Sequence, residues 1–346
     1  IAQCLVGSEM CIRDRDKAVR RILSLKFQMG LFDDPFVDEK QAVQLVASSE
    51  HTGLAREVAR QSIVLLKNKD KLLPLKKDIR TLAVIGPNAN NVYNMLGDYT
   101  APQADGTVVT VLDGIRQKVS KETRVLYAKG CAVRDSSRTG FKDAIETARN
   151  ADAVVMVMGG SSARDFSSEY EETGAAKVTI NQISDMESGE GYDRATLHLM
   201  GRQLELLEEI SRLGKPVVLV LIKGRPLLME GAIQEAEAIV DAWYPGMQGG
   251  NAVADVLFGD YNPAGRLTLS VPRSVGQLPV YYNTRRKGNR SRYIEEPGTP
   301  RYPFGYGLSY TTFSYTDMKV QVTEGSDDCR VDVTVTIQNQ GTADAV

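Results

Sequence analysis

Glu190 stands between two glycines in the segment SGEGYDR, residues 188–194. Glycine has no side chain, so the backbone on either side of this carboxyl group can lie close to a bulky ligand. A carboxyl group in such a place suits general acid/base chemistry, in which a side chain donates a proton to a leaving group and later takes one from water. The hydrolysis of a glycosidic bond works in this way and needs two carboxyl groups.

A second glutamate, Glu187, precedes this segment, and chemistry alone does not choose between the two. A proton donor must be protonated near neutral pH, which requires partial burial or a neighbouring negative charge. Residues 159–196 can supply that charge, because they are rich in acidic side chains and show no sustained period. Loops of this length are uncommon and are often functional. A solvated acidic loop without a catalytic role is the alternative.

Three other side chains of the segment can support a catalytic carboxyl group. Tyr192 can stack on a sugar ring or simply pack against the protein. Arg194 can pair with Asp193 or with Glu187 and pin the loop. We therefore treat these residues as candidates for substrate binding or for support of the loop.

Strands and helices alternate on both sides of the acidic loop. Strands that consist of continuous apolar runs are buried on both faces, which indicates parallel pairing under layers of helices. We expect an α/β fold with a doubly wound, mostly parallel, six-stranded sheet. The loops after its strands line one edge, where ligands bind. Apolar runs predict the strands at residues 82–85, 125–127, 154–158, 216–222, 238–243 and 267–271.

Two helices are expected ahead of the first strand, at residues 16–29 and 52–67, because apolar side chains recur there at helical spacing. Close to the other end of the chain, Val331, Val333 and Val335 alternate with polar residues. This alternation is typical of a half-buried strand. One or two such strands cannot form a stable sheet alone, so we expect the chain to be a fragment.

Composition excludes several classes of protein. A net charge of −2 gives no reason to expect nucleic acid or an anionic membrane as partner, and no apolar run is long enough to span a bilayer. The four cysteines lie far apart, and the two histidines, His51 and His198, have no metal-ligand spacing. The glycine-rich turn at residues 159–162 follows a strand, but no nucleotide-binding motif accompanies it. We expect no metal or organic cofactor.

Several short segments together resemble the second domain, an α/β sandwich, of glycoside hydrolase family 3, the β-glucosidase family. Each is modest, but their order along the chain is specific. They are AREVARQSIVLLKN (55–68), VIGPNA (84–89), KPVVLVL (215–221), AWYPGMQGG (242–250), DVLFG (255–259), NPAGRL (262–267) and YPFGYGLSY (302–310).

The resemblance implies roles for the carboxyl groups. Family members that carry Ser-Gly-Glu-Gly-Tyr use its glutamate as general acid/base, which favours Glu190 over Glu187. The nucleophile of the family is an aspartate on a strand of a TIM-like barrel, nearly all of which is expected to be absent here. Asp185 follows a serine, as that nucleophile does, but it lies in the acidic loop and is not assigned the role.

The resemblance also divides the chain into parts. The expected parts are a non-native leader (1–15), the end of the barrel with its linker (16–51), the α/β sandwich (52–275), a linker (276–311) and the start of a fibronectin-type-III-like β-sandwich (312–346).

The function implied is that of the C-terminal portion of a retaining, exo-acting β-glycosidase that releases terminal β-D-glucosyl residues. A β-xylosidase of the same family is the first alternative, and a non-catalytic carbohydrate-binding or structural module is the second. The expected partners are an oligosaccharide or β-glucoside substrate and the protein's own N-terminal barrel. The family suggests a periplasmic or secreted protein, and the isolated chain is expected to be inactive.

Overall fold

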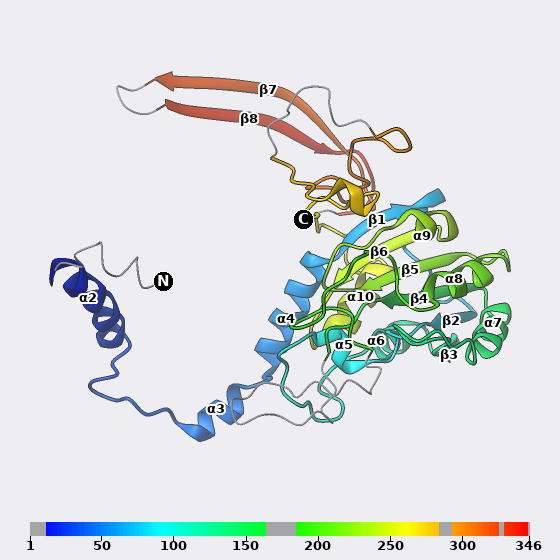
Figure 1. The fold of residues 1–346 in the computed structure, drawn as a ribbon, viewed down its shortest axis with the longest axis horizontal. Coiled ribbons are helices and arrows are strands. Elements are labelled where there is room, and N and C mark those ends of the chain that lie inside the picture. The colour runs from blue at the N-terminus through cyan, green and yellow to red at the C-terminus, as the bar shows by residue number, and fades with distance from the viewer. Residues whose placement is uncertain (1–11, 164–184, 284–292, 325–328, 345–346) are drawn as a thin grey trace. The chain divides into compact units, whose positions relative to one another are not determined.

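The computed structural model describes residues 12–163, 185–283, 293–324 and 329–344 (Figure 1). The chain divides into two compact units, Ile1–His51 and Thr52–Val346. In the first unit, the described helices are α2 (Ile12–Gln28) and α3 (Glu39–Leu45), and Asp38 caps α3 by accepting hydrogen bonds from two backbone amides. The helix predicted at residues 16–29 corresponds to α2.

The second unit contains the predicted doubly wound sheet, which confirms the fold class. Its strand order is β1-β6-β5-β4-β2-β3, and all neighbours are parallel except β1 and β6. The strands are β1 (Val64–Asn68), β2 (Thr81–Ile85), β3 (Arg124–Ala128), β4 (Ala153–Gly159), β5 (Val217–Ile222) and β6 (Ala238–Trp243).

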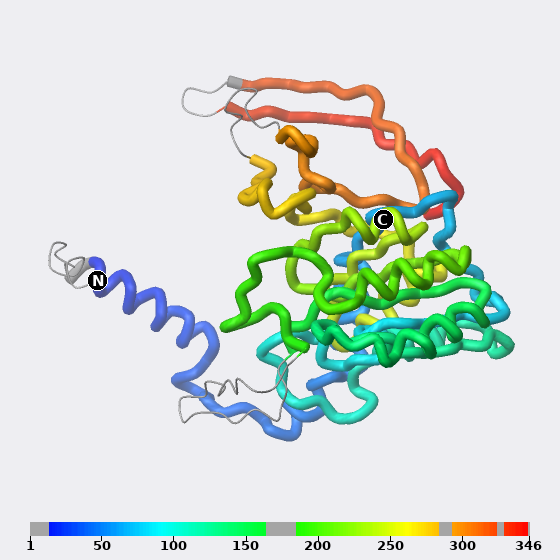
Figure 2. Tube along the Cα trace, turned by 45° about the vertical axis from the view of Figure 1, so that its right-hand side comes forward, coloured from blue at the N-terminus to red at the C-terminus, as the bar shows by residue number. Residues whose placement is uncertain are grey.

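Helices cover both faces of this sheet, and Figure 2 follows the chain through the layers. Alternate residues of each central strand point to opposite faces, so that Val155 and Val157 join one core while Val154 and Met156 join the other. The first core also holds α4 (Ser49–Ser62), α5 (Val92–Leu96), α6 (Val111–Lys118) and α10 (Gly249–Leu257). The second holds α7 (Phe141–Arg149), α8 (Gln203–Ser211) and α9 (Glu230–Glu235).

One predicted helix is too long, and one predicted strand is absent. The helix expected at residues 52–67 ends at Ser62, and the apolar run that follows forms β1 instead. Leu65 faces one core while Val64 and Leu66 face the other, which suits an extended strand between two layers. Because β1 takes the place beside β6, residues 267–271 are not a sixth strand, and Val271 makes only an isolated bridge to Tyr302.

The C-terminal residues form a small antiparallel sheet of two strands, β7 (Phe313–Glu324) and β8 (Cys329–Asn339). Strand β8 confirms the alternation seen in the sequence. Its apolar side chains are nevertheless exposed, with Val333 61% accessible, rather than half-buried. Among the described residues no second layer covers them.

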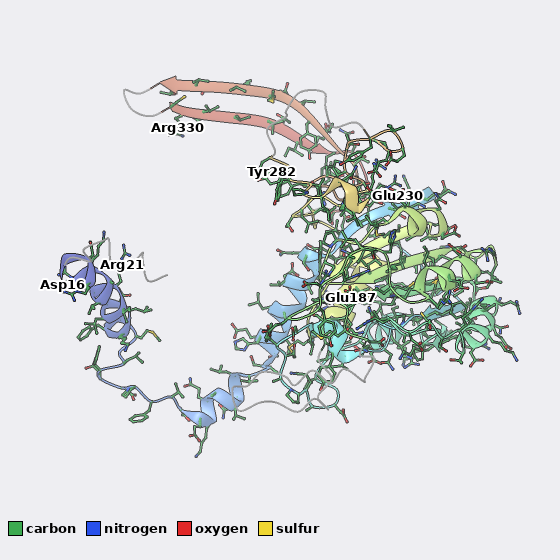
Figure 3. The ribbon with its side chains drawn as sticks, viewed as in Figure 1. Asp16, Arg21, Glu187, Glu230, Tyr282 and Arg330 are labelled. Carbon is green, nitrogen blue, oxygen red and sulfur yellow. The ribbon has the colours of Figure 1, made fainter. Side chains whose placement is uncertain are left out.

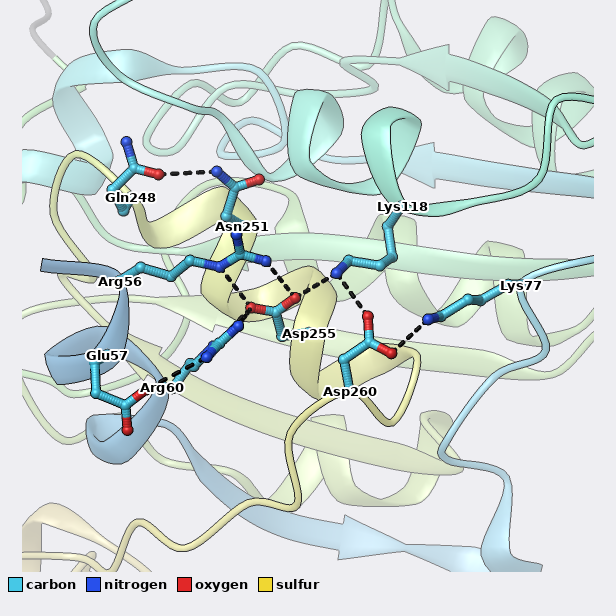
Figure 4. Close-up of polar contacts among 9 residues, drawn as sticks. All are labelled: Arg56, Glu57, Arg60, Lys77, Lys118, Gln248, Asn251, Asp255 and Asp260. Carbon is cyan, nitrogen blue, oxygen red and sulfur yellow. Dashed lines mark hydrogen bonds and ion pairs between the residues drawn. The ribbon is translucent and has the colours of Figure 1, made fainter. Parts of the chain in front are cut away.

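A group of charged side chains, here called the Asp255 cluster, joins α4 and α6 to α10 (Figure 4). Asp255 is fully buried and accepts hydrogen bonds from both nitrogens of the Arg56 fork, at 2.6 and 2.7 Å, from Arg60 at 2.7 Å and from Lys118 at 2.5 Å. Asp260 completes the cluster by accepting from Lys118 and Lys77. The cluster fixes α4 to the sandwich.

Burial by itself would raise the pKa of the Asp255 carboxyl group. The hydrogen bonds from Arg56, Lys118 and Arg60 outweigh this effect and lower its pKa to about 2. Asp255 therefore stays ionised at neutral pH.

The connections define where a ligand can approach the sheet. From β2 the chain moves to β3 on one side, and from β4 it moves to β5 on the other. The loops after these two adjacent strands therefore leave in opposite directions, and the crevice between them is the place where doubly wound proteins bind ligands. No helix of the described residues is both long and apolar enough to cross a membrane.

Candidate active site

Buried amide groups tie together the strand ends at this crevice. The Asn88 side chain, just after β2, donates hydrogen bonds to the carbonyl oxygens of Gly160 at 3.1 Å and Ile222 at 3.3 Å. It also accepts one from Asn94 at 2.7 Å, and Asn94 in turn accepts one from Ser161 at 2.7 Å. The ends of β2, β4 and β5 are therefore held as one rigid platform.

Glu187 fills the turn that follows β4. Its backbone amide donates to the carbonyl oxygen of Ser161 at 2.8 Å, and a Cβ atom placed on Gly160 would lie 2.0 Å from Glu187 Oε1. The Glu187 side chain is only 1% exposed, and Figure 3 labels it among the packed side chains of the sandwich. The glycine-rich turn at residues 159–162 therefore packs against a carboxylate of the protein itself.

Two arginines hold Glu187 and the loop around it. Arg194 donates to Glu187 Oε2 at 2.5 Å and also to the carbonyl oxygen of His198, and its side chain is 6% exposed. Arg225 lies 4.0 Å from the same carboxylate oxygen and donates to the carbonyl oxygen of Tyr192 at 3.3 Å. Of the two partners that the sequence left open for Arg194, the structure shows Glu187.

Glu190, in contrast, is exposed at the tip of a turn. Its neighbours Gly189 and Gly191 have φ values of +110° and +80°, which side chains rarely tolerate. The hydroxyl group of Tyr99, from the loop after α5, donates to Glu190 Oε2 at 2.7 Å. The two glutamates are therefore separated by environment, since one is buried in an ion pair and the other reaches the surface.

The remaining candidates surround this turn. Tyr192 is half-buried, and the guanidinium group of Arg134 lies 6.0 Å from the centre of its ring. Asp193 is exposed. Asp185 accepts hydrogen bonds from the backbone amides of Val133 at 3.1 Å and Arg134 at 3.2 Å, so it ties the loop to the segment after β3. This contact supports leaving Asp185 out of the catalytic roles.

Sequence reasoning missed several residues that shape the site. Tyr99 lies in a stretch with no periodic pattern, and nothing in the sequence distinguishes it. A signal did exist for Lys223 and Asp241, because Asp241 interrupts an apolar strand. Lys223 donates to it at 2.6 Å, both side chains are buried, and the ammonium group lies 3.9 Å from the ring centre of Trp243. The Trp243 ring thus packs against this buried ion pair of the sheet.

The described residues contain no group of three or more histidine, cysteine, aspartate or glutamate side chains that could hold a metal ion. The chemistry that this edge of the sheet can offer is a proton donor or acceptor at Glu190, on a loop fixed from below by the Glu187–Arg194 pair.

Known proteins share this arrangement of sequence and fold. The sequence model of the glycosyl hydrolase family 3 C-terminal domain matches residues 63–310. A β-xylosidase from Formosa agariphila is 41% identical over 94% of the chain, and a periplasmic β-glucosidase from Salmonella typhimurium is 38% identical over 97%.

The fold of the chain is also similar to solved structures of β-glucosidases. A β-glucosidase from Erythrobacter marinus matches 94% of the chain with a TM-score of 0.79 and 38% identity, and one from Listeria innocua matches 95% with a TM-score of 0.76 and 31% identity. The chain spans less than half of each relative, between 43% and 45% of its length. By sequence and by fold, the chain belongs to glycosyl hydrolase family 3.

Proposed function

We propose that this chain is the part of a retaining, exo-acting β-glycosidase that supplies the general acid/base, Glu190. The observation that carries the proposal is the contrast between two glutamates of one loop in a family 3 chain. Glu187 is buried and paired with Arg194, so its carboxylate supports the loop. Glu190 is exposed between two glycines at the ligand-binding edge of the sheet, where it can reach a substrate.

The proposed reaction has two steps. A carboxylate nucleophile, an aspartate of the barrel that the family resemblance implies, attacks the anomeric carbon while Glu190 protonates the leaving oxygen. Glu190 then acts as base on a water molecule, which releases the sugar with retained configuration. We propose that this nucleophile lies outside the chain and that the isolated chain has no meaningful turnover. Enzyme-level rates from residues 16–346 alone would contradict this.

The relatives are named β-glucosidases and β-xylosidases, so two sugars are candidates for the substrate. We propose β-glucosides as substrates, with β-xylosides second, and a periplasmic or secreted location like that named for the Salmonella relative. Comparing kcat/KM for an aryl β-glucoside and the matching aryl β-xyloside tests the choice of sugar. A higher value for the xyloside would reverse it.

Hydrolysis of an aryl β-glucoside by the full-length gene product tests the role of Glu190. Replacing it by alanine is expected to lower turnover at least ~10²-fold, the low end for a general acid/base. A small anion such as azide should restore part of the activity. Asp105→Ala is the matched control, because it removes another exposed carboxyl group from a loop. Unchanged turnover in Glu190→Ala would favour a non-catalytic carbohydrate-binding module.

A further inference from the structure

Tyr99 combines three properties that a surface tyrosine rarely shares. The residue is 78% exposed, its φ of +58° lies in the left-handed region that residues other than glycine avoid, and its hydroxyl group donates to Glu190 Oε2 at 2.7 Å. Backbone strain of this kind persists only where the surrounding structure imposes it, and it concentrates at functional sites.

The loop that carries Tyr99 is packed against the turn that contains Gly189 and Glu190. A Cβ atom on Gly189 would lie 2.9 Å from Asp98 Oδ2, so only glycine lets the two segments approach this closely. The backbone amide of Tyr99 donates to Asp98 Oδ1 at 2.8 Å. Asp98 and Tyr99 thus contact two successive residues of the turn, Gly189 and Glu190.

Tyr244 contacts both segments. A Cβ atom on Gly97 would lie 3.0 Å from its ring, and one on Gly224 would lie 2.5 Å from it. The Tyr244 hydroxyl group is 3.1 Å from the Ser188 hydroxyl group. Because Gly97 and Ser188 precede the two contacting segments directly, the tyrosine ring fixes the distance between them.

From these contacts we propose that Tyr99 is a positioning residue for Glu190 in proton transfer to the leaving group, an inference that rests on the proposed function. A hydrogen bond to one carboxyl oxygen fixes the rotation of the group and so the direction of the other oxygen. In the first step that oxygen gives its proton to the glycosidic oxygen as the bond to the anomeric carbon breaks. The hydroxyl group of Tyr99 keeps its own proton throughout.

The test compares two β-glucosides that differ in their need for a proton. Methyl β-glucoside has an alkoxide leaving group that must be protonated, whereas 2,4-dinitrophenyl β-glucoside expels a stable phenolate without help. In the full-length gene product, Tyr99→Phe keeps the ring and removes only the donor. We expect kcat/KM to fall about tenfold for the methyl glucoside, as for the loss of one hydrogen bond to a charged group, and less than about twofold for the dinitrophenyl glucoside.

Controls separate this inference from the function on which it rests. Glu190→Ala should show the same dependence of kcat/KM on the leaving group, with a larger loss. Tyr127→Phe, on the edge strand β3, should leave kcat/KM unchanged for both substrates. An equal loss on both substrates in Tyr99→Phe, or no loss on either, would overturn the positioning role. If Glu190→Ala itself left both substrates unchanged, the proposed function would fail first.

Discussion

The Asp255 cluster and the loop that carries Glu187 and Glu190 both contain charged side chains, but these side chains have different roles. Asp255 is fully buried, and its oxygens accept bonds from Arg56, Arg60 and Lys118. In the loop, Glu187 is also buried and accepts a hydrogen bond from Arg194, but only through one of its two oxygens, while Glu190 is exposed. A cluster of charged side chains is therefore by itself a structural feature. A candidate for catalysis is the carboxyl group that the cluster positions but does not bury.

The largest effect is expected where a buried pair is broken in the loop. Arg194→Met leaves the Glu187 carboxylate buried without its main partner, since the two side chains are 6% and 1% exposed. Removing one member of such a pair typically costs about 3–5 kcal/mol of unfolding free energy. Urea denaturation measures the loss. Arg212→Met is the control, because that side chain is 65% exposed and its ion pairs should contribute less than about 1 kcal/mol.

If Arg194→Met and Arg212→Met destabilised the protein equally, the loop would not depend on the Glu187–Arg194 pair.

A somewhat smaller effect is expected in the Asp255 cluster. Asp255→Asn should cost about 3 kcal/mol, the low end for a broken buried pair, because its cationic partners keep between 17% and 32% of their side chains in contact with solvent. Since the cluster joins α4, α6 and α10 and takes none of its residues from the loop after β4, the folded variant should retain the kcat/KM of the parent. Asp260→Asn, whose carboxyl group is 33% exposed, should cost less than about 1 kcal/mol. A selective loss of kcat/KM in Asp255→Asn would erase the distinction between the two regions.

The pH dependence of stability should report the same cluster. The pKa of Asp255 falls from 3.8 to about 2 on folding, so its contribution is complete above pH ~4 and is lost as the pH falls toward ~2. The shift corresponds to roughly 2 kcal/mol. Urea unfolding at several pH values should show the unfolding free energy of the parent falling between pH ~4 and ~2. The fall should be smaller in Asp255→Asn. The same slope in both proteins would assign the acid sensitivity to other carboxyl groups.

The smallest effects are expected from the two glycines beside Glu190. Gly191→Ala meets no neighbouring atom within 4 Å, so it should lose only about 1 kcal/mol for its positive φ. Gly189→Ala also has a positive φ, at +110° farther from the left-handed region than the +80° of Gly191, and its Cβ atom would meet Met186 and Asp98, at 2.5 and 2.9 Å. It should therefore be the less stable and the less active of the two. Equal stability and activity would mean that the contact with Asp98 does not brace the turn.

Much of the fold could be predicted because its central strands are encoded locally. The run at residues 154–158 is apolar at every position, and the structure buries it on both faces. Strand β1 was missed because its residues continue the apolar pattern of the preceding helix, and its partner, β6, lies far along the chain. Periodicity within one segment cannot reveal a strand that is defined by a distant partner.

The sequence singled out candidate residues for the site but not the contacts that they make. Flanking glycines and a family motif could single out Glu190, but no pattern could separate it from Glu187 by environment. Burial separates them, and burial depends on Arg194 and Arg225, which come from different loops. Tyr99 had no signal, because its contact with the turn arises only when the loops after β2 and β4 meet.

The most direct test is to identify the product that Glu190→Ala forms from an activated aryl β-glucoside in the presence of azide. If Glu190 is the acid/base of a retaining enzyme, the intermediate still forms, and azide attacks it without a general base. The expected result is a β-glucosyl azide together with a higher turnover. Turnover equal to that of the parent, with glucose as the only product, would contradict the role of Glu190.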